Sequence, residues 1–87
     1  MILLTGFEPF GDSYINPSEK IAKHLNGINI AGQDIHTLIL PVDTLQAPVQ
    51  LLDSLRQNEP AAVVCLGFAI GRPAISIERL AVNLMDF

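Results

Sequence analysis

Two short runs of this sequence are apolar without any alternation of polar residues. Residues 2–5 read Ile-Leu-Leu-Thr, and residues 61–66 read Ala-Ala-Val-Val-Cys-Leu. A strand with one face in solvent alternates apolar and polar residues, whereas a strand buried on both faces is continuously apolar, as in parallel sheets. Both runs are therefore predicted to be buried strands of a parallel sheet, with 2–5 in a central position.

An amphipathic helix is predicted soon after the first run. The sequence Asn-Pro-Ser-Glu at 16–19 is typical of a helix start, with Asn16 as the N-cap, proline at the first helical position and Glu19 placed to reach back to the cap. The helix is expected to continue through Leu25 and to end at Asn-Gly 26–27, since this pair favours left-handed backbone.

A second strand and a second helix are predicted in the middle of the chain. Residues 35–40 are rich in Ile and Leu and precede a proline, which favours an extended strand. A helix is expected to begin near Asp43 or Thr44, to carry apolar residues at three- and four-residue spacing, and to close at 58–60. With a strand-like segment at 71–83, the order β-α-β-α-β-β predicts an α/β fold with a mainly parallel sheet.

The composition indicates that the chain has too few polar residues to cover its hydrophobic residues. Of its 87 residues, 49% are hydrophobic and 16% are charged, against roughly 25% charged in an average soluble domain. The excess suggests part of a larger core, or a face buried against another chain. The sequence also stops inside an apolar run at 84–87. We therefore expect residues 1–87 to form one domain at most and to be truncated.

Charge and motif spacing argue against several classes of protein. The net charge is −4 and the five basic residues form no cluster, so we expect no nucleic-acid partner. No apolar run reaches the roughly 18 residues that span a bilayer, so no membrane association and a cytoplasmic location are expected. His24 and His36 lack metal-ligand spacing to other residues, and no metal site is predicted. The single cysteine, Cys65, excludes an internal disulfide and is expected to be inert in a buried strand.

Two loops follow predicted strands and are candidates for a ligand site. Loops 6–16 and 67–73 leave the carboxyl ends of their strands, where parallel sheets bind ligands, so they could converge on one pocket. The first has the glycine spacing of a phosphate-binding loop, but Asp12 stands where that motif needs lysine and would repel phosphate. Phe7 and Phe10 fit better as walls for a small, flat, apolar ligand group. On the residues alone, however, phenylalanines such as these are more often simple core residues.

An acidic residue, Glu78, interrupts the apolar segment 71–83. A buried carboxylate is costly unless it is paired. Two interpretations remain open from the residues alone: a structural ion pair with Arg72 or Arg79, and a functional carboxylate.

Motifs spread over nearly the whole chain resemble the N-terminal part of a single peptidase domain, that of the pyroglutamyl peptidase I family, also called pyrrolidone-carboxylate peptidases. They are Leu-Leu-Thr-Gly-Phe-Glu-Pro-Phe-Gly at 3–11, Asn-Pro-Ser at 16–18, Leu-Pro at 40–41, Cys-Leu-Gly at 65–67, Gly-Arg at 71–72 and Ile-Glu-Arg-Leu-Ala-Val-Asn at 77–83. The resemblance implies a phosphorylase/hydrolase-like α/β fold with one sheet sandwiched by helices. It also implies a tetrameric thiol protease, an omega peptidase that removes N-terminal pyroglutamate from peptides without metal or cofactor.

The resemblance also implies roles for individual residues. The family uses a cysteine nucleophile, a histidine base and an acidic residue, and only the acid has a counterpart here, Glu78, which would orient the imidazolium. Phe7 and Phe10 match the aromatics that line the pyroglutamyl pocket, and Phe68 in the loop after residue 66 would form another wall. Cys65 does not match the nucleophile position. The 87 residues alone are therefore predicted to be inactive.

Two positions depart from the family's pattern. Phe68 stands where close relatives commonly have Gln, and Ile70 replaces a small residue, so the pocket is expected to be more apolar. An inactive remnant, or a module that self-associates through its apolar surface, is the alternative function. A small-ligand binding protein without catalysis is a weaker third option.

Overall fold

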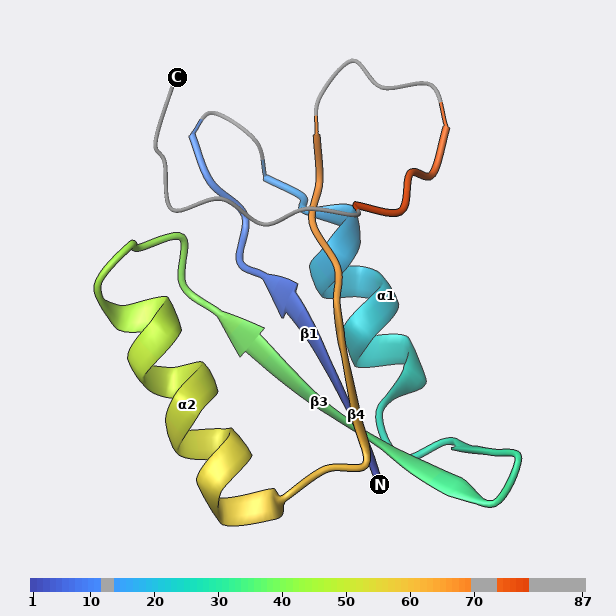
Figure 1. Ribbon diagram of the computed structural model, residues 1–87. Helices are drawn as coiled ribbons and strands as arrows, with labels where there is room; N and C mark the ends of the chain where they lie inside the picture. The colour runs from blue at the N-terminus through green and yellow to red at the C-terminus, as the bar shows by residue number, and fades with distance from the viewer. Residues whose placement is uncertain (12–13, 70–73, 79–87) are drawn as a thin grey trace.

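The computed structural model describes residues 1–11, 14–69 and 74–78. It contains a four-stranded mixed sheet and two helices (Figure 1). The elements in chain order are β1 (Ile2–Phe7), α1 (Pro17–Leu25), β2 (Asn29–Ile30), β3 (Gln33–Leu40), α2 (Gln46–Asn58) and β4 (Ala62–Cys65).

Strand β1 lies inside the sheet, as its continuous apolar sequence predicts. The strand order is β2-β3-β1-β4, with β1 parallel to both β3 and β4 and with β2 antiparallel to β3. The connections through α1 and α2 leave β1 and β3 in opposite directions along the sheet, so right-handed crossovers place the two helices on opposite faces. Figure 1 shows them on the two sides of the strands. The predicted α/β fold, a mixed sheet sandwiched by helices, is confirmed.

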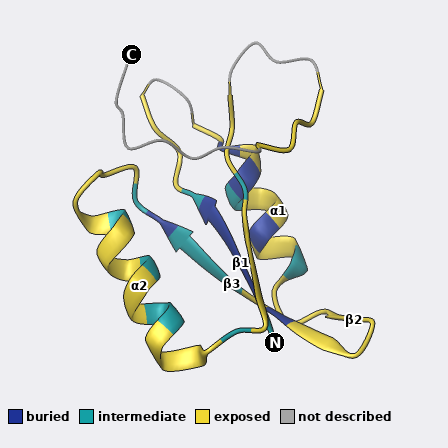
Figure 2. Ribbon diagram, in the orientation of Figure 1, coloured by how far each residue is buried: buried dark blue, intermediate teal, exposed yellow. Residues whose placement is uncertain are grey.

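The core lies between β1, β3 and α1. Leu4, Ala22 and Ile35 form its buried centre, and partly buried apolar side chains of both strands, of α1 and of Leu66 pack around it. Leu4 and Ile35 face the helix because alternate residues of a strand share one face. The buried residues in Figure 2 are concentrated in this part of the molecule.

The bounds of α1 were predicted correctly, but Asn26, which was expected in left-handed backbone, is extended with φ −61° and ψ 128°. Asn16 has extended backbone and its side chain accepts a hydrogen bond from the backbone N–H of Ser18, as an N-cap does. After Leu25 the chain leaves the helix, and Gly27 takes a φ of +82° that suits glycine. The Glu19 carboxylate lies 3.8 Å from the ammonium group of Lys23, one turn further along.

Helix α2 begins at Gln46, slightly later than predicted, because Asp43 forms a turn ahead of it. Asp43 Oδ1 accepts hydrogen bonds from the backbone N–H groups of Leu45 at 2.8 Å and Gln46 at 3.0 Å. These two bonds, the one from Gln46 above all, hold the pKa of the Asp43 carboxyl below its ordinary value. The helix ends at Asn58, and Glu59 follows in left-handed backbone with φ 44°.

A β-hairpin between β2 and β3 was not predicted. Its two-residue turn consists of Ala31 and Gly32, with φ values of 51° and 82°. Such a turn normally contains Asn-Gly or Asp-Gly. Alanine is uncommon at positive φ, so the sequence lacks the usual signal for this hairpin.

The prediction of a buried strand at 61–66 is wrong in its burial. β4 forms at Ala62–Cys65, but all of its residues are exposed (Figure 2). It pairs with β1 on one side and forms the edge of the sheet among the described residues. The expectation that Cys65 is buried is therefore also wrong, since its thiol is free and exposed, while its inertness stays a prediction.

Part of the predicted final strand is described. Residues 74–78 contain no strand, and 79–83 lie outside the described residues. No helix in the described part of the chain is long and apolar enough to cross a membrane.

Candidate functional site

The two candidate loops leave the same edge of the sheet. Because β1 and β4 are parallel, their carboxyl ends lie together, and just beyond the end of β4 the Leu66 N–H donates a hydrogen bond to the Thr5 carbonyl at 2.9 Å. Beyond this hydrogen bond, the loops that follow Phe7 and Leu66 extend past the carboxyl ends of the strands (Figure 1). The prediction that both loops occupy one end of the sheet is confirmed by this topology.

An open groove lies between the start of α1, β4 and the segment 74–78. Its volume is about 1010 Å³. It is lined by Pro17, Ser18 and Ile21 of α1, by residues 63–69 and by residues 74–78. Most of these side chains are apolar, and among the described residues that line the groove Glu78 is the only carboxylate. The groove thus combines an apolar surface with one acidic group.

The predicted site residues are divided between this groove and the neighbouring loop. Phe68 and Glu78 both line the groove. Phe7, half-buried at the end of β1, and Phe10, 37% exposed in the following loop, are not among the lining residues. The groove lining therefore includes Phe68 and Glu78, whereas Phe7, at the end of β1, and Phe10, in the following loop, lie outside it.

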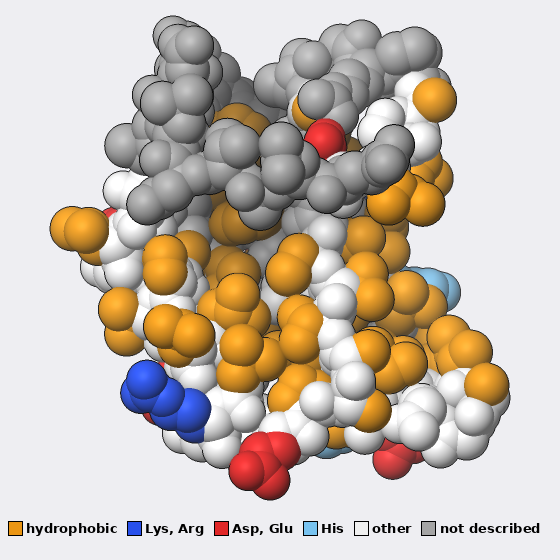
Figure 3. All heavy atoms as spheres, in the orientation of Figure 1, with side chains coloured by type: hydrophobic (Ala, Val, Ile, Leu, Met, Phe, Trp, Pro, Cys, Tyr) orange, Lys and Arg blue, Asp and Glu red, His pale blue; other side chains and the backbone are white. Residues whose placement is uncertain are grey.

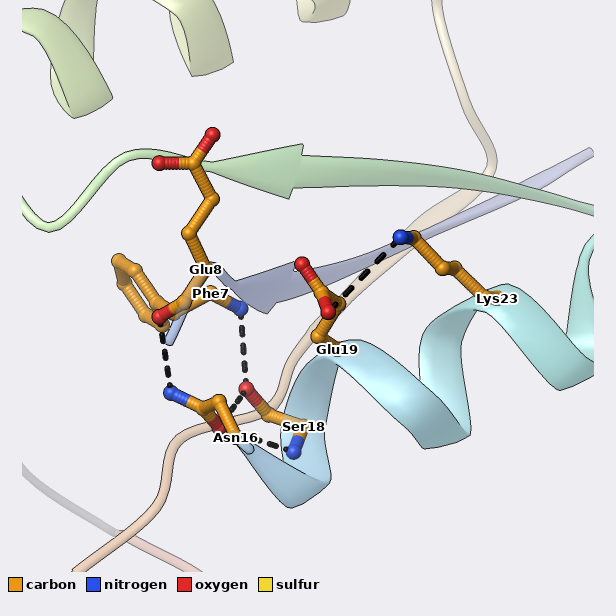
Figure 4. A network of polar contacts seen from close by, with 6 residues as sticks. All are labelled: Phe7, Glu8, Asn16, Ser18, Glu19 and Lys23. Carbon is orange, nitrogen blue, oxygen red and sulfur yellow. Dashed lines mark hydrogen bonds and ion pairs between the residues drawn. The ribbon is translucent and has the colours of Figure 1, made fainter. Parts of the chain in front are cut away.

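A network of hydrogen bonds holds the first loop against the start of α1 (Figure 4). The Phe7 N–H donates to Ser18 Oγ at 2.9 Å, and Asn16 Nδ2 donates to the Glu8 carbonyl at 3.2 Å. Ser18 Oγ and Asn16 Oδ1 are themselves 2.7 Å apart. Asn16 and Ser18 are only 1% and 3% exposed. The sequence identified Asn16 as a helix cap but missed these contacts with the preceding loop.

Gly6 permits the close approach of helix and strand on which this network depends. A Cβ atom at Gly6 would lie 2.8 Å from the carbonyl carbon of Ser18 and 3.2 Å from Ala22 Cβ. Contacts that close require the backbone of α1 to move. Glycine at this position therefore allows Ser18 to reach the end of β1.

The other titratable candidates are less informative. Glu78 is exposed, and Arg72 and Arg79, its predicted ion-pair partners, lie outside the described residues. His24 and His36 are exposed and are not among the groove's lining residues. Within the described ranges, no group of three or more His, Cys, Asp or Glu residues is placed to hold a metal ion.

Known proteins resemble this chain over its whole length. The sequence model of the pyroglutamyl peptidase family matches residues 1–87. A pyrrolidone-carboxylate peptidase of Pyrococcus furiosus is 47% identical over 85 residues, which are 98% of this chain and 41% of the relative. One of Coprothermobacter proteolyticus is 44% identical over 86 residues, or 99% of this chain and 42% of the relative.

Solved structures agree with the sequence matches. The crystal structure of pyrrolidone carboxyl peptidase from Pyrococcus furiosus superposes with a TM-score of 0.93 at 47% identity, covering 98% of this chain and 41% of that one. Pyroglutamyl peptidase I from Bacillus amyloliquefaciens gives a TM-score of 0.78 at 34% identity, covering 82% of this chain and 34% of that one. This chain spans about two fifths of the length of the curated relatives above. By sequence and by fold, the chain belongs to the pyroglutamyl peptidase family.

Proposed function

We propose that this chain supplies the N-terminal part of a pyroglutamyl peptidase, an enzyme that removes N-terminal pyroglutamate from peptides by a Cys-His-Glu mechanism. The observation that carries this proposal is the position of Glu78 in a mostly apolar groove, where it is the single carboxylate among the lining residues that the structure describes. Family membership over residues 1–87 supports the same reading.

Glu78 would act through a histidine. A carboxylate that accepts a hydrogen bond from an imidazole fixes the ring's tautomer and orientation and stabilises the imidazolium. That histidine would take the proton from a cysteine thiol, and the thiolate would attack the carbonyl carbon that follows the pyroglutamyl ring. The histidine would then give the proton to the amine of the departing peptide as the amide bond breaks, and water would hydrolyse the thioester to release pyroglutamate and restore the thiol. By resemblance to the family, neither the cysteine nor the histidine is among residues 1–87, so these residues alone are expected to be inactive.

The aromatic residues would recognise the pyroglutamyl ring. The ring is small, flat and uncharged, and stacking against aromatic faces removes it from water while a few polar groups orient it. Phe68 lines the groove beside Glu78, and Phe7 and Phe10 would approach from the neighbouring loop. We further propose a homo-oligomeric enzyme of the cytoplasm that needs no metal or cofactor and has no nucleic-acid or membrane partner.

A hybrid enzyme tests this proposal. In this hybrid, the present chain replaces the 85 aligned residues of the Pyrococcus furiosus relative. The assay is release of a fluorescent amine from a pyroglutamyl amide. We expect turnover by the hybrid and none by the 87-residue chain. A folded hybrid without activity would contradict the proposed function, and turnover by the chain alone would contradict the assignment of the nucleophile and base to residues outside it.

Substitution of the carboxylate tests the role of Glu78 within the hybrid. Glu78→Gln keeps the size of the side chain but removes its charge, and kcat should fall by about 10³-fold. The matched control is Glu59→Gln, an exposed glutamate that does not line the groove, and it should retain activity within about twofold. Equal activities of the two variants would remove Glu78 from the mechanism.

A self-associating module is the second candidate, and the exposed apolar surface of the second half favours it. Apolar side chains extend across the face seen in Figure 3. Ile75 and Ile77 are 99% and 89% exposed, and Val63 and Val64 of β4 are also exposed. Apolar surface of this kind marks association sites. Sedimentation of the 87-residue chain as a stable oligomer, together with an inactive hybrid, would favour this candidate.

A further inference from the structure

We infer that Ser18 is a positioning residue that joins the aromatic loop of Phe7 and Phe10 to the groove of Phe68 and Glu78. This inference rests on the proposed function, because it assigns both regions to recognition of one substrate. Ser18 belongs to both regions: its hydroxyl bonds the backbone of Phe7, and its side of α1 forms part of the groove wall.

At the end of β1, the Ser18 hydroxyl accepts a backbone hydrogen bond that a neighbouring strand would otherwise accept. Backbone groups of successive strand residues point to alternate sides. Thr5 C=O accepts from Leu66 on the β4 side, and Glu8 N–H donates to Leu40 on the β3 side at 3.0 Å. The Phe7 N–H therefore points toward β4, which has already ended at Cys65. Ser18 Oγ satisfies this donor where the sheet no longer can.

The donor and the acceptor of each hydrogen bond around Ser18 follow from the chemistry of the groups. Since Phe7 N–H can only donate, Ser18 Oγ accepts there at 2.9 Å and uses its own proton to donate to Asn16 Oδ1 at 2.7 Å. That oxygen also accepts from Ser18 N–H at 3.0 Å. The Asn16 amide is thereby oriented with Nδ2 toward the Glu8 carbonyl, to which it donates at 3.2 Å. Two successive residues of the loop are held through one serine.

The network fixes the backbone of the loop and leaves its side chains free to bind. Phe7 and Glu8 contribute only main-chain groups to it. In Figure 4 the Glu8 carboxylate points away from Asn16 and Ser18. Removing the Ser18 hydroxyl would leave the Phe7 N–H without its acceptor. Asn16 Oδ1 would lose one of the two hydrogen bonds that it accepts and keep the one from Ser18 N–H. The direction in which the aromatic loop leaves β1 would then be poorly defined relative to the groove.

The test compares Ser18→Ala with Ser54→Ala in the hybrid enzyme. Ser54 is the matched control because its Oγ also accepts a side-chain hydrogen bond, from Asn58 at 3.1 Å, but on α2. Loss of one buried hydrogen bond that orients the substrate pocket should raise KM about tenfold for Ser18→Ala. Its kcat should stay within about twofold, because the reacting groups are untouched. Ser54→Ala should leave both constants within about twofold.

Amide hydrogen exchange provides the readout that general destabilisation would not reproduce. In Ser18→Ala the Phe7 amide should exchange about tenfold faster relative to the adjacent Glu8 amide, whose partner Leu40 is unchanged. A general loss of stability would accelerate both amides together.

Either an unchanged KM or an unchanged exchange ratio in Ser18→Ala would overturn the inference, as would a fall in kcat at constant KM. A hybrid that is inactive with Ser18 in place would instead contradict the proposed function, and the exchange ratio alone would then decide whether Ser18 holds the loop.

Discussion

The two crossovers of this chain each connect two parallel strands through one helix, but they differ greatly in packing. All the residues described as buried lie within the first crossover, β1-α1-β3, and its entry loop. In the second, β3-α2-β4, helix α2 has no buried residue and every residue of β4 is exposed. Figure 2 shows this contrast directly.

This difference shows that an apolar sequence pattern favours burial of a segment but does not show that another element is present to bury it. Leu4 and Val64 are paired in the register of β1 and β4 and lie on the same face. Leu4 has a strand on each side and α1 above it, and is 6% exposed, whereas Val64 on the edge strand is 46% exposed. Their sequence contexts are equally apolar. Position in the sheet decides their burial.

Truncation of these two paired residues should show the largest contrast. Leu4→Ala removes buried methyl groups from the core and should lower the free energy of unfolding by about 3 kcal/mol. Val64→Ala should cost less than about 1 kcal/mol, because much of the side chain is already in water. Urea unfolding of the chain followed by circular dichroism measures both. Equal losses would show that β4 is as well covered in solution as β1.

Two glycines provide the next test. Gly6→Ala forces a Cβ against the backbone of Ser18 and should cost about 2 kcal/mol. Gly67→Ala, in the loop after β4, meets nothing within 4 Å and should stay within about 0.5 kcal/mol of the parent chain. The same unfolding measurement applies. A tolerated alanine at Gly6 would mean that α1 can move away from β1, which would also weaken the inference about Ser18.

The turns that precede the two helices should differ in their response to pH. The pKa of Asp43 before α2 is lowered from 3.8 by its hydrogen bonds from Gln46 and Leu45. Its contribution is therefore fully present above pH 3.8 and is lost as the pH falls through the lower pKa of the folded chain. Asn16, the cap of α1, does not titrate.

Asp43→Asn isolates this contribution, since it keeps an acceptor oxygen without a titrating group. The parent chain should lose slightly more stability than Asp43→Asn when urea unfolding midpoints are compared between about pH 6 and pH 3. The effect should be small, because Asp43 is exposed. Identical pH profiles would show that the charge of Asp43 does not support α2.

The smallest effect is expected at Cys65. Its side chain is exposed on β4, so Cys65→Ser should change the unfolding free energy by less than about 0.5 kcal/mol. A thiol reagent such as Ellman's reagent should also modify the folded chain without denaturant. Strong protection of the thiol would indicate that another surface covers β4 in solution.

The sequence predicted best what depends on local chemistry. Asn16 caps the start of α1 with its side-chain oxygen, and Gly27, which has no Cβ, takes the positive φ that follows the end of the helix. Asp43 marked the beginning of α2 only approximately, because its carboxylate forms a turn before the first helical residue. The hairpin turn at Ala31 could not be predicted, since alanine gives no signal for positive φ.

The location of the candidate site could be predicted from the sequence, but the set of side chains that line it could be predicted only in part. Parallel strands place their following loops at one end of the sheet, so the loops after Phe7 and Leu66 could be brought together from the order of elements. The division between Phe68 and Glu78 in the groove and Phe7 and Phe10 outside its lining depends on side-chain directions. The role of Ser18 depends on contacts between segments distant in sequence, which periodicity does not encode.

The confinement of buried residues to the first crossover has a consequence for biosynthesis. A ribosome makes the chain from its N-terminus, so Leu4, Ala22 and Ile35 are all available before α2 and β4 have been synthesised. Pairing Ile2 with Ala62 closes a longer loop than pairing Ile2 with Ile35, but the additional entropy cost is only about 0.5 kcal/mol. The order of synthesis therefore favours the first crossover more than loop length does. We expect the nascent chain to gather its core first and to add β4 to the open edge of β1 as the last step.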